Sequence, residues 1–203
     1  MSLWDDIKNS PVITDEGPLP ESDELAGMIP RDFAKDPWGG LGFAAPFSGP
    51  TIPRSEWRGI VEKKKRERSR LIDRIADCGW FPAHQAQTNW CWANAVTMAL
   101  ELMDVIQRGS WERLSPASLA WPLVGGNYGG YVTEALRLSA EKGVATAATW
   151  EPNSFSQRKD TPASLESRER NKVDHWWDLQ PRNIDQLVTC LLQDDPVSPA
   201  GGF

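Results

Sequence analysis

Residues 91–108 (CWANAVTMALELMDVIQR) form an uninterrupted stretch without glycine or proline, and this stretch restricts the possible folds most strongly. Apolar side chains would occupy most of the circumference of a helix built from it. Such a helix must be covered by other elements on several sides, so it belongs in the middle of a domain. We therefore expect a central buried helix that begins at Cys91.

A second helix is indicated at residues 131–142, where apolar positions recur at helical spacing. Gly143 follows, and a glycine can end a helix by adopting the left-handed conformation. Farther along we expect a polar loop at residues 153–172 and a strand at residues 173–179. The inward positions of this helix are expected to be Val132, Ala135, Leu136 and Leu138.

The last expected helix follows Asn183, which is a candidate N-cap. Gln186 stands three residues later, at the spacing of a capping box. We expect this helix to end before Pro196, because proline cannot continue a helix. Its apolar positions at helical spacing are Ile184, Leu187, Val188, Leu191 and Leu192.

The N-terminal quarter of the chain has a different composition. Residues 1–53 hold eight of the 16 prolines, and residues 1–50 contain nine acidic residues against three basic ones. Such a sequence cannot readily bury enough surface to offset the entropy lost on ordering. Isolated apolar residues, such as Trp4 and Trp38, nevertheless occur in it. Three interpretations stay open: a disordered tail, an extended arm laid over the domain or a neighbouring chain, and a cleavable propeptide.

The charge changes sign in the next segment. Residues 54–74 contain nine Lys or Arg and four Asp or Glu. We expect one basic helix over residues 54–78, stopped by Gly79. The cluster could bind an anionic surface, but a solvated helix face is the expected state, and the acidic N-terminal arm is an available partner. The chain is thus divided into an acidic, proline-rich arm (1–53), a basic helix and a domain over residues 79–203.

Composition narrows the possible functions. The net charge of −6 argues against a mainly nucleic-acid-binding role, and no apolar run is long enough to span a membrane. The start of the chain, MSLWDDIKNS, lacks the features of a secretory signal.

Three widely spaced cysteines do not form a disulfide framework, so we expect a reducing, cytoplasmic compartment or an assembled particle. Only His84 and His175 are present, which excludes a histidine-rich metal site. The 11 tryptophans predict extensive burial or a partner surface.

Cys91 stands where the physical chemistry of a helix favours a nucleophile. The unpaired N–H groups and the dipole of a helix N-terminus stabilise negative charge, and the thiolate is the nucleophilic form of cysteine. Gln85 and Gln87 lie just upstream. A side-chain amide near a nucleophile can stabilise the oxyanion of an acyl-transfer intermediate. Thiol acyl transfer requires no cofactor and no metal.

Residues 84–103 (HQAQTNWCWANAVTMALELM) resemble the glutamine, loop and Cys-Trp-Ala helix of the papain-like cysteine peptidases. Gln85 precedes Cys91 by the same six positions as the oxyanion-hole glutamine of that family. The resemblance implies an α+β, papain-like fold, represented mainly by its helical subdomain, with an incomplete second, β subdomain. It also implies that Cys91 is the nucleophile, that Gln85 is the oxyanion donor and that the substrate is a peptide or protein.

Four further segments resemble the family in the same order along the chain. LSPASLAWPL is similar to its Leu-Ser segment, and NYGGYVTEAL to its Asn-Gly-Gly-Tyr stretch. EKGVATAATWEP resembles the following Gly-Val turn and Tyr-Pro strand, and LQDDPVS the strand that opens its second subdomain. The resemblance assigns Gly129, Gly130 and Trp92 to substrate binding.

The sequence also departs from the family pattern. Thr88, Asn89 and Trp90 stand where the family usually has Cys-Gly-Ser before its nucleophile, which removes the cysteine of a disulfide common in secreted members. Because Trp90 replaces a small residue beside the cleft, we expect it to narrow the cleft. The variant Asn-Trp-Cys-Trp-Ala is closer to some bacterial and effector peptidases than to lysosomal ones.

The larger departure concerns the general base. In papain-like enzymes the histidine and asparagine lie about 130–150 residues after the cysteine, and this chain ends at Phe203. We expect His84 and His175 to be structural or solvent-facing rather than substitutes. Without a base to protonate the leaving amine, the chain as written should be inactive or nearly so as a peptidase.

Three interpretations of function follow. In the first, the chain is part of a longer peptidase. In the second, it is a noncatalytic papain-fold module for structure or interaction, which binds protein partners through its N-terminal arm in a virion or other assembly. In the third, a second chain supplies the histidine.

Overall fold

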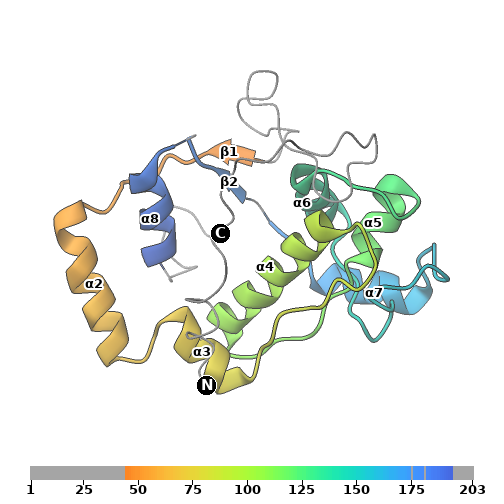
Figure 1. Ribbon diagram of the computed structural model, residues 1–203, viewed down its shortest axis with the longest axis horizontal. Helices are drawn as coiled ribbons and strands as arrows, with labels where there is room; N and C mark the ends of the chain where they lie inside the picture. The colour runs from red at the N-terminus through yellow and green to blue at the C-terminus, as the bar shows by residue number, and fades with distance from the viewer. Residues whose placement is uncertain (1–43, 175, 181, 194–203) are drawn as a thin grey trace, which may run out of the picture.

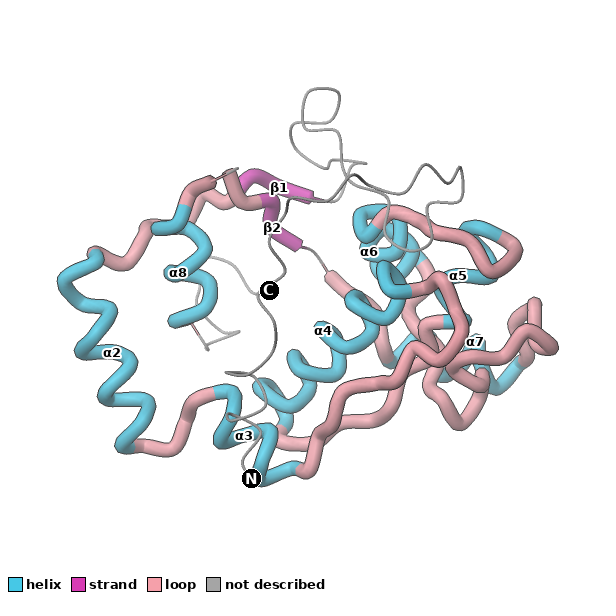
Figure 2. The backbone as a smooth tube through the Cα atoms, in the orientation of Figure 1, coloured by secondary structure: helices cyan, strands magenta, loops and turns pink. Residues whose placement is uncertain are grey.

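Helix α4 (Cys91–Arg108) runs through the middle of the structure, a computed structural model that describes residues 44–174, 176–180 and 182–193 (Figure 1). The expected start at Cys91 is confirmed, and the helix ends where Gly109 adopts a left-handed φ of 65°. The expected burial is confirmed as well. Its buried side chains are Trp92, Ala93, Asn94, Val96, Thr97, Glu101 and Val105. The described part of the chain is mixed but mostly helical, with two short strands (Figure 2).

Helices on one side of α4 enclose the hydrophobic core. Helices α5 (Ala117–Val124) and α6 (Val132–Glu141) pack against α4 and against each other. Helix α7 (Pro162–Arg170) lies at the same end of the molecule (Figure 1). The core contains four of the tryptophans, which confirms extensive burial of this residue type. Its buried members are Trp90, Trp92, Ala93, Val96, Leu114, Ala117, Leu119, Ala120, Trp121, Ala135, Leu138, Val144, Ala145 and Trp150.

The opposite side of the structure is built from the two ends of the described chain. Helix α2 (Arg54–Arg66) packs against α8 (Ile184–Leu192). Strand β1 (Ala44–Pro46) pairs in parallel with β2 (Trp176–Asp178), the shorter core of the expected strand.

Two polar contacts attach the end of the proline-rich segment and the start of α2 to α8. The backbone N–H of Ile52 donates to Thr189 Oγ1 at 2.9 Å, and Arg54 Nε donates to Asp185 at 2.7 Å. Residues 44–53 therefore lie against the domain, whereas residues 1–43 of the expected arm lie outside the described residues.

The basic segment forms two helices, α2 and α3 (Leu71–Cys78), instead of one helix over residues 54–78. Arg68 adopts a left-handed φ of 52° at the break. Residues 62–70 are all charged or polar, so no buried face holds a continuous helix together there. Helix α2 has no buried residue, as expected for a solvated face, and Gly79 ends α3 at a φ of 67° as predicted.

Helix α7 is a second difference, because residues 153–172 were expected to form a loop. Its sequence shows no apolar periodicity, and its leucine, Leu165, is exposed. The sequence signal for this helix is the pair of capping residues at its N-terminus instead. Thr161 and Ser164 form a reciprocal capping box, with Pro162 in the first turn.

The remaining expected helices are confirmed. Helix α6 begins and ends within one residue of the predicted range, with Gly143 at a φ of 74° beyond its end. Asn183 caps α8 by accepting a hydrogen bond from the Gln186 N–H. Pro196, which was expected to follow this helix, lies outside the described residues.

Arg168 on α7 joins three segments of the core although only 1% of its surface is exposed. Its guanidinium donates to Asp160 at 2.6 Å, to the Gly143 carbonyl at 2.7 Å and to the Ser118 carbonyl at 2.6 Å. It also lies 5.5 Å from the centre of the Trp150 ring. A buried charge with this many partners stabilises one arrangement of these segments, and its removal leaves acceptors unpaired.

We predict that Arg168→Ala lowers the free energy of unfolding by about 3–5 kcal/mol, because it removes the ion-pair partner of Asp160 and the donor to two carbonyls, those of Gly143 and Ser118. Urea denaturation followed by tryptophan fluorescence measures the loss. Arg170→Ala, an exposed position on the same helix, is the control and should change stability by less than about 0.5 kcal/mol. Equal effects of the two substitutions would show that the buried contacts are not structurally important.

Candidate functional site

Cys91 is the first residue of α4 and is partly exposed. The loop before it, residues 85–90, lies beside residues 126–130. The Asn89 N–H donates to Asn127 Oδ1 at 2.6 Å, and Trp90 Nε1 donates to the Gly126 carbonyl at 2.9 Å. The structure thus places the glutamine loop beside the glycine segment, directly before Cys91 at the start of one helix.

Gln85 lies in this loop, and its side-chain amide donates to the Thr88 carbonyl. Thr88 Oγ1 donates back to the Gln85 carbonyl at 2.8 Å, and Ala86 between them has a left-handed φ of 55°. Residues 85–88 therefore form a closed turn, in which the side-chain amide of Gln85 is bound to the backbone of the same turn. A primary amide has two N–H donors, so a second one remains for another acceptor.

Trp92 does not occupy a position from which it could bind substrate, because only 1% of its surface is exposed. Its ring lies directly under Gly130, where a Cβ atom on the glycine would come within 2.6 Å of the indole. Its Nε1 donates to the Tyr128 carbonyl at 3.4 Å. Trp92 therefore supports the glycine segment from below. Gly130 is itself buried, and Gly129 is partly exposed.

The expectation that Trp90 narrows the cleft is wrong, because its ring is fully buried in the core. It packs edge-on against Trp121, with centroids 6.0 Å apart, and against Phe155 at 5.1 Å. Burial of a large ring is favourable when its N–H finds an acceptor, and the Gly126 carbonyl provides one.

His84 is exposed, and its Nδ1 accepts a hydrogen bond from the Ala86 N–H at 2.9 Å. Its carbonyl accepts from Asn153 Nδ2 at 3.1 Å. These contacts give His84 a role in shaping the loop. His175 lies outside the described residues.

Glu101 is a buried acidic residue near the middle of α4 that the sequence analysis did not single out. Its carboxylate accepts from Trp80 Nε1 at 2.9 Å, from the Leu114 N–H at 2.8 Å and from Arg113 at 2.9 Å. Burial raises the pKa of Glu101, and these donors oppose that shift. An acidic residue in a helix that was expected to be buried over most of its circumference was the signal that could have indicated it. Its role is structural, since it joins α4 to two neighbouring loops.

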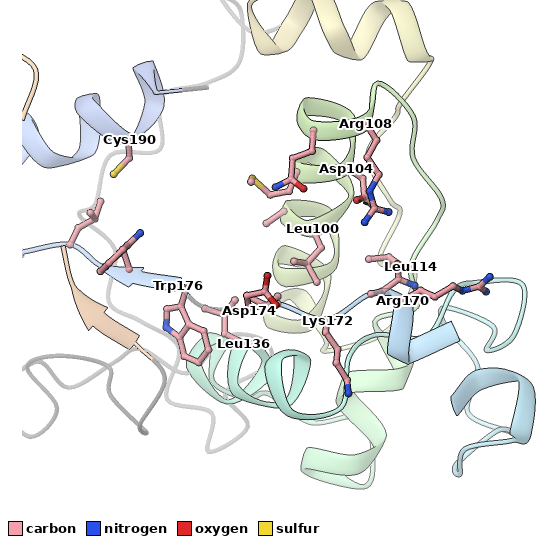
Figure 3. A pocket seen from close by; sticks show the side chains of 17 residues that line it. Leu100, Asp104, Arg108, Leu114, Leu136, Arg170, Lys172, Asp174, Trp176 and Cys190 are labelled. Atoms are coloured by element: carbon pink, nitrogen blue, oxygen red, sulfur yellow. Dashed lines mark ion pairs between the residues drawn. The ribbon is translucent and has the colours of Figure 1, made fainter. Parts of the chain in front are cut away.

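A cavity of about 400 Å³ lies between α4, β2 and α8. Figure 3 shows Leu100, Asp104 and Arg108 on its α4 wall, with Trp176 and Cys190 across from them. Cys91 and Gln85 do not line it, so this cavity is separate from the candidate site. Its described lining residues are Ala99, Leu100, Met103, Asp104, Gln107, Arg108, Leu114, Leu136, Arg170, Asn171, Lys172, Val173, Asp174, Trp176, Trp177, Leu179 and Cys190.

Burial raises the pKa of two groups in this cavity, the Asp104 carboxyl and the Cys190 thiol. Arg108, 3.3 Å from Asp104, opposes the shift of the carboxyl. Among the described residues, no group of three His, Cys, Asp or Glu side chains could hold a metal ion. In the same part of the chain, no helix is long and apolar enough to cross a bilayer.

We predict that Gly130→Ala destabilises the fold and displaces the glycine segment, because its methyl group would overlap the buried Trp92 ring. The expected loss is about 1–3 kcal/mol, measured by urea denaturation. Gly59→Ala is the matched control: it lies inside α2 with open space around it and should stabilise by about 0.5–1 kcal/mol. A neutral Gly130→Ala would contradict the close packing of Trp92.

We predict that Asp104→Asn gains stability relative to the wild type as the pH rises. A carboxyl whose pKa is raised above its ordinary 3.8 in the folded state favours folding when protonated, and this contribution is lost as the pH rises through the folded-state pKa. Asparagine stays neutral throughout. Denaturation from pH 4 to pH 7 should therefore show the variant improving against the wild type; a difference independent of pH would contradict the raised pKa.

Comparison with known proteins gives no family from which a function could be assigned. No protein-family model matches this chain, and neither the curated proteins nor the solved structures that were compared with it give a match. The function must therefore be argued from the residues around Cys91.

Proposed function

We propose that this chain carries the nucleophile-bearing part of a papain-like thiol acyl-transfer site. Cys91 would be the nucleophile, Gln85 the oxyanion donor and a peptide or protein the substrate. The observation that carries the proposal is the meeting of three parts at the start of α4: a partly exposed cysteine, the closed glutamine loop and the segment with Gly129 and Gly130.

The chemistry of a helix start supports Cys91 as the attacking group. Negative charge on its sulfur would lie at the positive end of an 18-residue helix, where N–H groups lack intrahelical partners. Attack on a carbonyl carbon forms a C–S bond and places a negative charge on the carbonyl oxygen. The Gln85 amide can donate its second N–H to that oxygen while its first N–H stays on the Thr88 carbonyl.

The glycine segment offers the surface on which a peptide could lie. Tyr128 and Tyr131 flank Gly129 and Gly130 and expose 66% and 44% of their surface. Gly130 must lack a side chain because the Trp92 ring lies beneath it. A peptide passing this segment would meet the partly exposed backbone of Gly129 and the tyrosine rings on either side.

Turnover also requires a base that takes the thiol proton and later protonates the leaving amine. His84 is held at Nδ1 by the Ala86 N–H, in the role of a loop-shaping residue. We therefore propose that the base comes from a further segment or from a second chain. Without that base an attacked peptide bond cannot release its amine, so neither the thioester nor its hydrolysis product would form at a useful rate.

A noncatalytic papain-fold module is the second candidate, and one observation favours it. Ile184, Leu187 and Leu191 form an exposed apolar stripe on α8, with 53%, 44% and 69% of their surfaces accessible. Stripes of this kind are typical of surfaces that bind another protein. In this alternative the arm and α8 would bind partners in an assembly, and Cys91 would be an ordinary thiol.

The three cysteines provide an internal test, because all are partly exposed. We predict that a peptide-based thiol electrophile labels Cys91 at least about tenfold faster than Cys78 or Cys190 at neutral pH. Burial raises the pKa of Cys190, which should make it the slowest of the three. Mass spectrometry of tryptic peptides gives each rate, and Cys91→Ser provides the background.

The same measurement separates the two candidate functions. Preferential labelling of Cys91 by the peptide electrophile, but not by small iodoacetamide, indicates a substrate-binding nucleophile site. Equal rates at the three thiols with both reagents would exclude an activated nucleophile and favour the noncatalytic module.

A further inference from the structure

Asn127 uses its side chain and its carbonyl to hold the loop that precedes Cys91. Its Oδ1 accepts from the Asn89 N–H at 2.6 Å, and its Nδ2 donates to the Gln87 carbonyl at 3.2 Å. Its backbone carbonyl accepts from Asn89 Nδ2 at 3.1 Å. The two asparagines therefore bind each other through side chain and backbone, across 38 residues of sequence.

The chemistry of these contacts requires an amide at position 127. One end of the side chain faces an N–H donor, and the other end faces a carbonyl acceptor, so the orientation of the amide is fixed by its partners. An aspartate could accept from Asn89 but could not donate to Gln87, and its charge would face the Gln87 carbonyl. An alanine would lose both side-chain bonds.

The contacts of Asn127 lie between two indole contacts that fix the same pair of segments. Trp90 Nε1 binds the Gly126 carbonyl, and Trp92 Nε1 binds the Tyr128 carbonyl. These two bonds fix the positions of Trp90 and Trp92, the residues on either side of Cys91. Of Trp90, Trp92 and Asn127, only Asn127 both donates to and accepts from the backbone of the upstream loop, at residues 87 and 89.

The loop held by Asn127 is the one that sets the position of Gln85. Thr88, whose carbonyl accepts the Gln85 amide, lies between the two residues that Asn127 binds and is itself buried. A shift of Gln87 or Asn89 would therefore move the acceptor on which Gln85 rests. It would also move the chain that enters α4 at Cys91.

We propose that Asn127 is a positioning residue for the Cys91 site: it holds residues 87–89 so that the Gln85 amide and the Cys91 thiol keep the separation that acyl transfer needs. The inference rests on the proposed function of Cys91 and adds the residue that maintains its geometry. Asn127 acts through Gln85 and does not contact the substrate.

The test compares Asn127→Ala and Asn127→Asp with the wild type, with Asn171→Ala as the matched control. Asn171 also donates a side-chain hydrogen bond to a backbone carbonyl, that of Ser167 at 3.0 Å, but at the end of α7. The first measurement is hydrogen exchange at the Asn89 amide. We expect lost protection in both Asn127 variants and unchanged protection in the control.

The second measurement is the rate of Cys91 labelling by the peptide electrophile, relative to Cys78 in the same sample. We expect about a tenfold decrease in both Asn127 variants, because a small displacement of a reacting group is costly. Labelling of Cys91 by iodoacetamide should change much less, since that reagent does not use Gln85. Asn171→Ala should leave both rates unchanged even if it lowers the melting temperature.

Each result has one meaning. Unchanged exchange at Asn89 in the Asn127 variants would show that the contact does not hold the loop. Lost protection with an unchanged labelling rate would show that Asn127 is only structural, and the positioning role would be rejected. If wild-type Cys91 reacts no faster than Cys78, the proposed function fails, and the positioning role fails with it, whatever the exchange data show about the loop.

Discussion

The burial of Glu101 inside α4 is the interaction on which the surrounding structure depends. A carboxylate removed from water is strongly destabilising unless donors replace its hydration. Here Trp80, Arg113 and the Leu114 N–H provide them. These donors come from the chain on both sides of α4 in sequence, so the central helix can be buried only when both flanking loops have reached their places. One charged group thus links the formation of the core to the position of the loops around it.

Tryptophan serves a similar purpose elsewhere, which explains why this chain uses it so much more than tyrosine. Five of the described indoles donate their N–H to a backbone carbonyl, and three of these, Trp90, Trp92 and Trp121, also fill core positions. The structure has only two short strands among its described residues, so backbone ladders cannot hold its long loops. Indole donors do so instead, and the pairs are Trp57 with Ile52, Trp90 with Gly126, Trp92 with Tyr128, Trp111 with Cys78, and Trp121 with Ser154.

This dependence on polar contacts also explains what the sequence could and could not predict. Apolar periodicity located α4 and α6, which bury apolar side chains, and also α8, whose apolar stripe is largely exposed. It missed α7, whose buried residues are Ser164, Ser167 and Arg168, and whose signal is a capping box. In the site, the resemblance implied roles for Gln85, Cys91 and the glycine segment, and the structure places the glutamine loop beside the glycine segment just before Cys91. The resemblance could not indicate that the Gln85 amide turns to Thr88, because this direction depends on one hydrogen bond.

The direction of Cys91 follows from its two neighbours. Trp90 precedes the helix with a φ of −102° and enters the core beside Trp121, whereas Trp92 enters it beneath Gly130. Successive side chains at a helix start point in different directions, so two buried rings on either side fix the rotation of the helix about its axis. The residue between them keeps partial exposure as a result. A large ring next to a candidate nucleophile therefore need not cover it: the burial of that ring can be the reason that the nucleophile stays partly exposed.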